Sequence, residues 1–128
     1  MKKETVLWLS YAHENLEVAQ LLLQSSFFNP CLQNIQQAIE KALKAALIEK
    51  ELGVKKTHNI QELVNILKKQ GIKLDVSENE CELIDSIYLS SKYPTGSVLP
   101  DFSPNKSICD KCIHLGFRIY DNITMVLN

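Results

Sequence analysis

Apolar residues recur every three or four positions along most of the chain, and no stretch alternates apolar and polar residues as a strand would. The first apolar stripe predicts a helix from about residue 3 to residue 26. Its members are Leu9, Ala12, Leu16, Ala19 and Leu23, widened by Trp8 and Leu22. The segment 27–30 interrupts the pattern, with Asn29 suited to an N-cap and Pro30 to the first position of a second helix.

The second predicted helix runs from about residue 30 to residue 52 and ends at Gly53, a residue favoured after a helix C-terminus. Its main stripe has the same spacing and consists of Leu32, Ile35, Ile39, Ala42 and Ala46. Leu43, Leu47 and Ile48 add apolar surface on neighbouring faces. We therefore expect this helix to be central and to touch two or more neighbours.

Two shorter helices follow, each after a capping pair. Asn59 and Glu62 are expected to cap a helix that stops at Gly71, and Ser77 with Glu80 caps the next. Their apolar faces are Ile60, Leu63, Val64 and Leu67 in one, and Cys81, Leu83, Ile84, Ile87 and Tyr88 in the other.

Residues 93–96 form a turn signature, and residues 97–103 are expected to be an extended surface loop. Ser103 and Pro104 then predict the start of a fifth helix. Its apolar face consists of Ile108, Cys112, Leu115, Ile119, Ile123 and Val126. Together these predicted helices indicate an all-α fold, an antiparallel helical bundle of about five helices with an up-and-down four-helix core.

The chain has 128 residues, 45% of them hydrophobic, which fits one domain over residues 1–128 and excludes disordered, collagen-like and low-complexity classes. With 14 basic and 15 acidic residues, the net charge argues against a dedicated nucleic-acid binder. The charge is uneven, however. Residues 41–73 hold eight Lys and three Glu, whereas residues 74–101 hold one Lys and six acidic residues. We therefore expect a dipolar surface whose basic half can face an anion.

No targeting or membrane segment is expected. The apolar residues 6–9 are too few for a signal peptide. The long uncharged run from residue 18 to residue 39 contains five Gln, two Asn and Pro30, which excludes a membrane span. We expect a cytoplasmic protein whose cysteines, Cys31, Cys81, Cys109 and Cys112, are reduced.

The run QQAIEKALKA at residues 36–45 resembles the signature of the HEPN domain family. Three flanking features fit the same family in order and spacing: an opening helix with Trp8, Leu16 and Ala19, the residues 57–60 (THNI), and the residues 92–94 (KYP). The resemblance implies a small helical bundle, often dimeric and commonly encoded beside a minimal nucleotidyltransferase. Such domains are proposed to bind nucleotides or to act as toxins on RNA.

The chain departs from the catalytic members of that family, which resemble one another in an Arg followed a few residues later by a His. Its one arginine, Arg118, has no histidine after it, and His114 lies before it. Lys92 stands where relatives often have Arg, which keeps the charge but loses the planar fork that grips phosphate. We therefore expect no catalytic residues. A ribonuclease toxin with an atypical site around Lys92, His58 or His114 stays an alternative, as does a plain homodimerisation module.

Polar residues Gln33, Gln37, Lys41 and Lys44 follow one another by four, four and three positions on the second helix. They form either a nucleotide groove, with amides for base or ribose and ammonium groups for phosphate, or an ordinary solvated helix face. His58 is either a phosphate contact or a local cap, and Tyr93 either stacks on a base or packs in a turn. The nucleotide-binding hypothesis therefore rests on Gln37, Lys41, Lys44, His58, Lys92 and Tyr93.

Cys109, Cys112 and His114 offer a single pair of cysteines, whereas a structural zinc site needs about four ligands. We expect no bound metal and no cofactor, since a Gly-rich phosphate loop, a His-Glu-x-x-His motif and a Gly-x-Ser-x-Gly motif are also absent from the sequence. The sequence thus favours a non-catalytic, nucleotide-binding or partner-binding subunit. It would be homodimeric and would act with a separately encoded minimal nucleotidyltransferase in a toxin–antitoxin-like module.

Overall fold

The computed structural model describes residues 1–53, 55–92 and 104–128, with the backbone alone for residues 89–92. This part of the chain contains no strand and forms five helices, as the sequence predicts. They are α1 (Lys3–Gln24), α2 (Phe28–Glu49), α3 (Ile60–Lys69), α4 (Glu78–Lys92) and α5 (Lys106–Leu127). The expected turn at residues 93–96, with Tyr93, and the loop after it lie outside the described residues.

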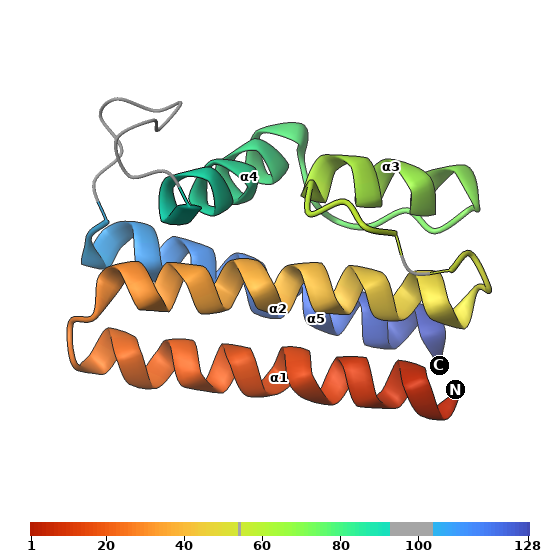
Figure 1. Ribbon diagram of the computed structural model, residues 1–128, viewed down its shortest axis with the longest axis horizontal. Helices are drawn as coiled ribbons and strands as arrows, with labels where there is room; N and C mark the ends of the chain where they lie inside the picture. The colour runs from red at the N-terminus through yellow and green to blue at the C-terminus, as the bar shows by residue number, and fades with distance from the viewer. Residues whose placement is uncertain (54, 93–103) are drawn as a thin grey trace.

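Helix α2 is the centre of the fold and packs against all four other helices. Figure 1 shows α1 along one side of α2, α5 behind it, and the two shorter helices α3 and α4 along the opposite side. Helices α1, α2, α4 and α5 alternate in direction, which is the expected up-and-down core, and α3 runs in the same direction as α2. The prediction that α2 touches several neighbours is confirmed.

The apolar stripes meet in one core. Fully buried side chains come from every helix and include Leu16, Leu32, Ile35, Ile39, Leu43, Leu63, Ile84, Leu115 and Ile119. Helix α5 approaches α1 and α2 so closely at Gly116 that an added Cβ would lie 2.8 Å from Leu16 Cδ2 and 3.3 Å from Ile35 Cγ2. Val126, which the pattern places on the buried face of α5, is instead 39% exposed near the helix end.

The predicted caps of the two short helices are confirmed. Asn59 Oδ1 accepts a hydrogen bond from the Glu62 amide at 2.8 Å at the start of α3. Ser77 Oγ accepts from the Glu80 amide at 3.1 Å, and Glu80 Oε1 accepts from the Ser77 amide at 2.9 Å. The start of α3 has a second acceptor on α4, because Asp85 accepts from the Ile60 amide at 2.7 Å. These bonds fix the segment before α3, which carries His58.

The expected ends of the long helices need correction. Helix α2 begins at Phe28 and its N-cap, Phe27, makes no side-chain cap, so the expected cap Asn29 lies inside the helix. The same helix ends at Glu49 rather than near residue 52. Helix α5 is capped by Asn105, whose side chain accepts from the Ile108 amide. The expected cap Ser103 lies outside the described residues.

No helix in the described part of the chain is both long enough and apolar enough to cross a membrane.

Candidate functional site

A groove of about 410 Å³ lies on α2 where α1, the segment before α3, and α4 meet it. Its lining residues come from all four of these segments and are mostly polar or aromatic: Trp8, Gln33, Gln36, Gln37, Glu40, Lys41, His58 and Tyr88. The predicted site residues Gln37, Lys41 and His58 therefore lie around one groove, although His58 is 17 positions after Lys41 in the sequence.

Glu40 is the centre of the polar contacts in this groove. Its carboxylate accepts hydrogen bonds from Lys44 Nζ at 2.9 Å and from Gln36 Nε2 at 3.1 Å, both within α2. His58 Nδ1 lies 3.0 Å from the same carboxylate. Burial by itself would raise the pKa of Glu40, but the bonds from Lys44, His58 and Gln36 outweigh it, so the pKa of Glu40 lies below its usual value. Glu40 is therefore an ionised carboxylate that holds its three neighbours in place.

His58 links the segment before α3 to both α2 and α4. One ring nitrogen contacts Glu40, and the ring stacks on Tyr88 with centroids 5.0 Å apart and planes inclined by 19°. The side chain is about half exposed, at 49%. The structure thus places His58 against a carboxylate and an aromatic ring on other helices, and its side chain does not serve as a local cap. Its second ring nitrogen, Nε2, is the one not held by Glu40.

Lys41 lies at the α1 side of the groove. Its Nζ donates to Asn15 Oδ1 at 2.8 Å and lies 6.0 Å from the centroid of the Tyr11 ring. The ammonium group has two more hydrogens for a ligand, since a lysine carries three donors. Gln37, one turn earlier, is exposed, and Gln33 is half-buried. Gln33, Gln37 and Lys41 thus form a continuous polar edge along α2.

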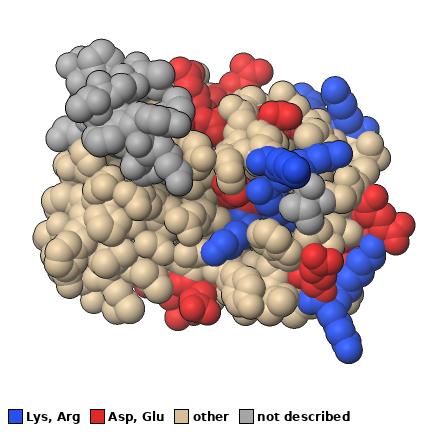
Figure 2. Space-filling model, viewed as in Figure 1, with Lys and Arg blue, Asp and Glu red and all other residues tan. Residues whose placement is uncertain are grey.

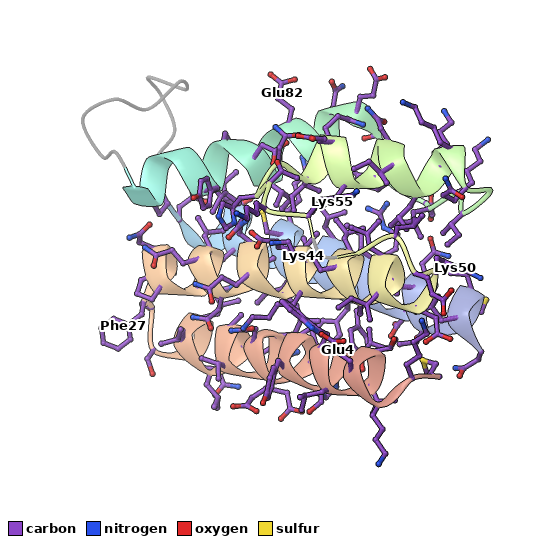
Figure 3. All side chains as sticks on the ribbon, turned by 45° about the vertical axis from the view of Figure 1, so that its right-hand side comes forward. Glu4, Phe27, Lys44, Lys50, Lys55 and Glu82 are labelled. Atoms are coloured by element: carbon purple, nitrogen blue, oxygen red, sulfur yellow. The ribbon has the colours of Figure 1, made fainter. Side chains whose placement is uncertain are left out.

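Lys44 is not on that solvated edge, which corrects the expectation from its spacing. Only 6% of the residue is exposed, and its Nζ contacts Glu40. Figure 3 shows Lys44 on the side of α2 that faces the segment carrying Lys55. That segment covers α2 here and brings His58 to Glu40, so Lys44 acts on the groove through Glu40.

The other predicted members are not placed in the groove. Lys92 ends α4, and only its backbone is described, while Tyr93 lies outside the described residues. Sequence reasoning missed Gln36, Glu40 and Tyr88 as site residues and assigned Trp8 only to the core. One signal was present for Glu40, because a carboxylate four residues before a lysine on a mostly apolar helix commonly forms a pair.

Arg118 and His114 take separate structural roles on α5. Arg118 donates through both terminal nitrogens to the Glu80 carboxylate and through Nη1 to the Asp75 carbonyl. His114 is exposed, and its Nδ1 lies 2.8 Å from the carbonyl oxygen of Asp110 in the preceding turn. Neither residue lines the groove on α2.

The cysteines are buried thiols. All four are free, and burial raises the pKa of Cys31 and of Cys112 to about 12. No three His, Cys, Asp or Glu side chains in the described ranges are grouped so that they could hold a metal ion.

Comparison with known proteins gives a family and a fold. The profile of the HEPN domain matches residues 5–123 of the chain. A crystal structure of an archaeal HEPN homologue has a TM-score of 0.66 at 20% identity, covering 99% of this chain and 100% of that one. A crystal structure of a protein from Thermus thermophilus has a TM-score of 0.67 at 23% identity, covering 97% of this chain and 98% of that one. No curated protein matches the sequence.

Proposed function

The chain belongs to the HEPN domain family, and we propose that it is a non-catalytic member that binds a nucleotide in the groove on α2 and acts with a separately encoded minimal nucleotidyltransferase. One observation carries the nucleotide part of the proposal. Gln37, Lys41 and His58, chosen from the sequence alone, lie around a single groove.

The chemistry of the groove suits a nucleotide. Its volume of about 410 Å³ falls within the range of small-molecule pockets, about 300–1,000 Å³. The Trp8 indole and the stacked rings of His58 and Tyr88 supply aromatic surface for a base, and Gln33 and Gln37 supply amides for its edges or for ribose. Lys41 supplies an ammonium group for phosphate.

The charge balance of the groove favours a ligand with few phosphates. Glu40 is neutralised by Lys44, which leaves Lys41 as the cation of the groove edge that contacts no carboxylate of the described residues. Such a site lacks both a Gly-rich cradle and, among the described residues, a metal-holding cluster. We therefore expect dissociation constants between micromolar and millimolar, weakened by salt.

Calorimetric titration with AMP, ATP, GTP and a short RNA tests the nucleotide site. The variant Gln37→Ala/Lys41→Gln is expected to lose at least tenfold in affinity, about 1.4 kcal/mol, for the ligand that the wild type binds. Gln20→Ala/Lys111→Gln is the matched control, because it removes one exposed amide and one exposed ammonium away from the groove. Absence of heat from every ligand, or equal binding by the two variants, would contradict the proposal.

The partner part of the proposal is supported by the family alone. A gene for a small nucleotidyltransferase beside the gene for this chain would be the first sign of it. The two proteins are then co-expressed and run on a sizing column. Co-elution in a fixed ratio is the expected result, and separate elution at micromolar concentration would contradict the pairing.

We also propose a homodimer, for a reason that differs from the one expected. The sequence placed the excess apolar surface on α2, but α2 is covered by its four neighbours. Four of the five large exposed apolar side chains of α1, all but Val6, instead form a stripe: Leu7, Tyr11, Val18 and Leu21. An exposed apolar stripe of this kind is a common subunit surface, and the two-fold dimer is the commonest oligomer.

A further inference from the structure

Six lysines lie in the stretch of chain that begins after the end of α2 and finishes in the loop after α3. They are Lys50, Lys55, Lys56, Lys68, Lys69 and Lys73, and all six are exposed. We refer to them together as the lysine surface. Figure 2 shows Lys and Arg side chains concentrated on the right-hand half of the visible face, where α2 and α3 end, with Asp and Glu side chains among them.

None of these six ammonium groups contacts a carboxylate of the described residues. Four other cations form the Lys and Arg ion pairs of the described residues, namely Lys2, Lys44, Lys106 and Arg118. Unpaired lysines repel one another, and a cluster of them therefore raises the local positive potential. Charges are screened beyond about 8–10 Å at physiological salt, so an anion is attracted by those lysines of this surface that lie within that distance of it.

Two of the six lysines share a polar groove. Lys68 and Lys73 line a space of about 100 Å³ together with the amides of Gln61 and Asn65, the Glu78 carboxylate and three apolar side chains. Lysines and side-chain amides are the groups that commonly donate hydrogen bonds to phosphate and sugar oxygens. This groove is separate from the candidate nucleotide groove, with which it shares no lining residue.

The lysine surface has no large apolar anchor. Among the described residues, the exposed large hydrophobic side chains lie at the N-terminus, on α1, at Phe27 and at the end of α5, and none lies between residues 50 and 73. A protein interface usually has an aromatic or aliphatic centre and few lysines. A phosphodiester backbone, in contrast, is bound mainly by charge. The composition therefore favours a nucleic-acid backbone over an acidic protein.

We propose that the lysine surface binds the phosphodiester backbone of a nucleic acid without reading its base sequence. The near-zero net charge of the chain does not oppose this, because residues 50–73 hold six lysines against two glutamates, and the other acidic residues are spread along the rest of the chain. Lysine is a hydrated point charge without the planar fork of arginine, and among the described residues from 50 to 73 no exposed Phe, Tyr or Trp offers a ring for base stacking. The contact is therefore expected to be weak, sequence-tolerant and strongly dependent on salt.

Fluorescence anisotropy across a salt series tests the proposal, with labelled single-stranded RNA, single-stranded DNA and duplex DNA as separate arms. Each phosphate contact contributes about 0.7 to the slope of log K against log salt for a single strand and about 0.9 for a duplex. Binding with a slope of about −2 or steeper is the expected result in at least one arm, and the tightest arm identifies the kind of nucleic acid. Polyglutamate is the competitor for an acidic protein.

The decisive variant is Lys68→Gln/Lys73→Gln, which removes both ammonium groups from the small polar groove. It is expected to make the slope shallower by about one for each lysine and to weaken binding about tenfold at low salt. Lys106→Gln/Lys111→Gln changes the net charge equally at the opposite end of the bundle and is expected to bind as the wild type does. Far-UV circular dichroism, which reports helical content, confirms that each variant is folded.

Three results would overturn the proposal: no binding in any arm, equal weakening by the two double variants, or polyglutamate binding as tightly as the nucleic acids. The Lys41→Gln variant separates this surface from the candidate nucleotide groove. If nucleotide binding fails but the backbone binding and its lysine dependence persist, the lysine surface stands without the nucleotide site.

Discussion

Lys44 donates a hydrogen bond to Glu40 one turn earlier in α2, with 2.9 Å between Nζ and Oε2, where both side chains are nearly out of solvent. The exposed fractions are 7% for Lys44 and 14% for Glu40. A carboxylate removed from water at this depth is stable only with donors around it. The same pair therefore supports the fold and fixes the carboxylate that holds His58 beside the groove.

Lys44→Met is expected to destabilise the protein by about 3 kcal/mol, because it leaves the Glu40 charge buried without its cation. Urea unfolding followed by circular dichroism measures the loss. The double variant Glu40→Leu/Lys44→Met should recover most of it, since replacing both partners by apolar groups removes the unpaired charge.

Lys106→Met serves as the comparison, because Lys106 and Asp110 also form an ion pair at a spacing of four residues in a helix. Their side chains are 75% and 45% exposed, so loss of this ion pair should change the free energy of unfolding by less than about 0.5 kcal/mol. Equal effects of the two lysine substitutions would contradict the buried role of Lys44.

The Glu80–Arg118 pair predicts an acid-sensitive contribution to stability. The side-chain bonds from Arg118 lower the pKa of Glu80 from 4.5 to about 2, despite the opposing effect of burial. Because the folded pKa is depressed, the contribution is complete above pH 4.5 and is lost as the pH falls toward 2. Glu80→Gln is expected to lower the free energy of unfolding by about 1 kcal/mol at pH 7. It should also make stability depend less on pH across that window.

Thermal unfolding across this pH window checks the prediction for Glu80. Glu82→Gln is the matched control, since Glu82 is an exposed acid on the same helix. A pH profile of Glu80→Gln that matches the wild type would show that the pair contributes nothing.

Gly116→Ala is expected to destabilise the protein by about 1–3 kcal/mol, although alanine is the better helix former. The added methyl group would lie 2.8 Å from Leu16 Cδ2, inside the contact distance. Denaturant unfolding of Gly116→Ala alone and with Leu16→Ala measures the clash. The double variant should lose less free energy of unfolding than the two single variants lose in sum. Losses that simply add would rule out the close approach.

The buried thiols predict a protein without stoichiometric zinc. Elemental analysis of the purified chain should find none, and a chelator should leave the melting temperature unchanged. Thiol reagents should react with Cys31 and Cys112 only as fast as the protein unfolds, because burial raises the pKa of both thiols to about 12. One zinc per chain, or rapid labelling of the folded protein, would contradict the structural role.

The stripe on α1 predicts the oligomeric state. Light scattering at micromolar concentration should give twice the chain mass of 14.6 kDa, and Leu7→Lys/Tyr11→Lys should reduce the particle to one chain. Phe27→Lys is the control, because Figure 3 shows Phe27 pointing away from the helices, off the stripe. A wild-type particle of one chain mass would remove the homodimer proposal.

The fold was predictable because its signals are local. Periodic apolar residues mark each helix, and the caps at Asn59 and Ser77 are side-chain bonds between residues three apart. The start of α2 was misplaced because no side chain caps it. The turn is instead closed by backbone bonds, such as that from the Phe27 amide to the Leu22 carbonyl.

The candidate site was only half predictable, because its other half depends on contacts between distant segments. The spacing along α2 singled out Gln37 and Lys41, and both residues line the groove. The same spacing cannot show that the segment before α3 covers Lys44 and brings His58 to Glu40. The close approach at Gly116 was likewise invisible, since it depends on which residues of α1 and α2 face α5.

The position of α2 among four neighbours has a consequence for how the molecule opens. A helix packed against four partners exposes its backbone amides only when several of them separate, so local fraying does not reach its middle. Hydrogen exchange in the middle of α2 should therefore report global unfolding. The ends of α1 and α5 should exchange through smaller openings. Because α1 and α2 are adjacent in sequence and pack closely along their length, their pairing is a low-contact-order step that favours rapid folding.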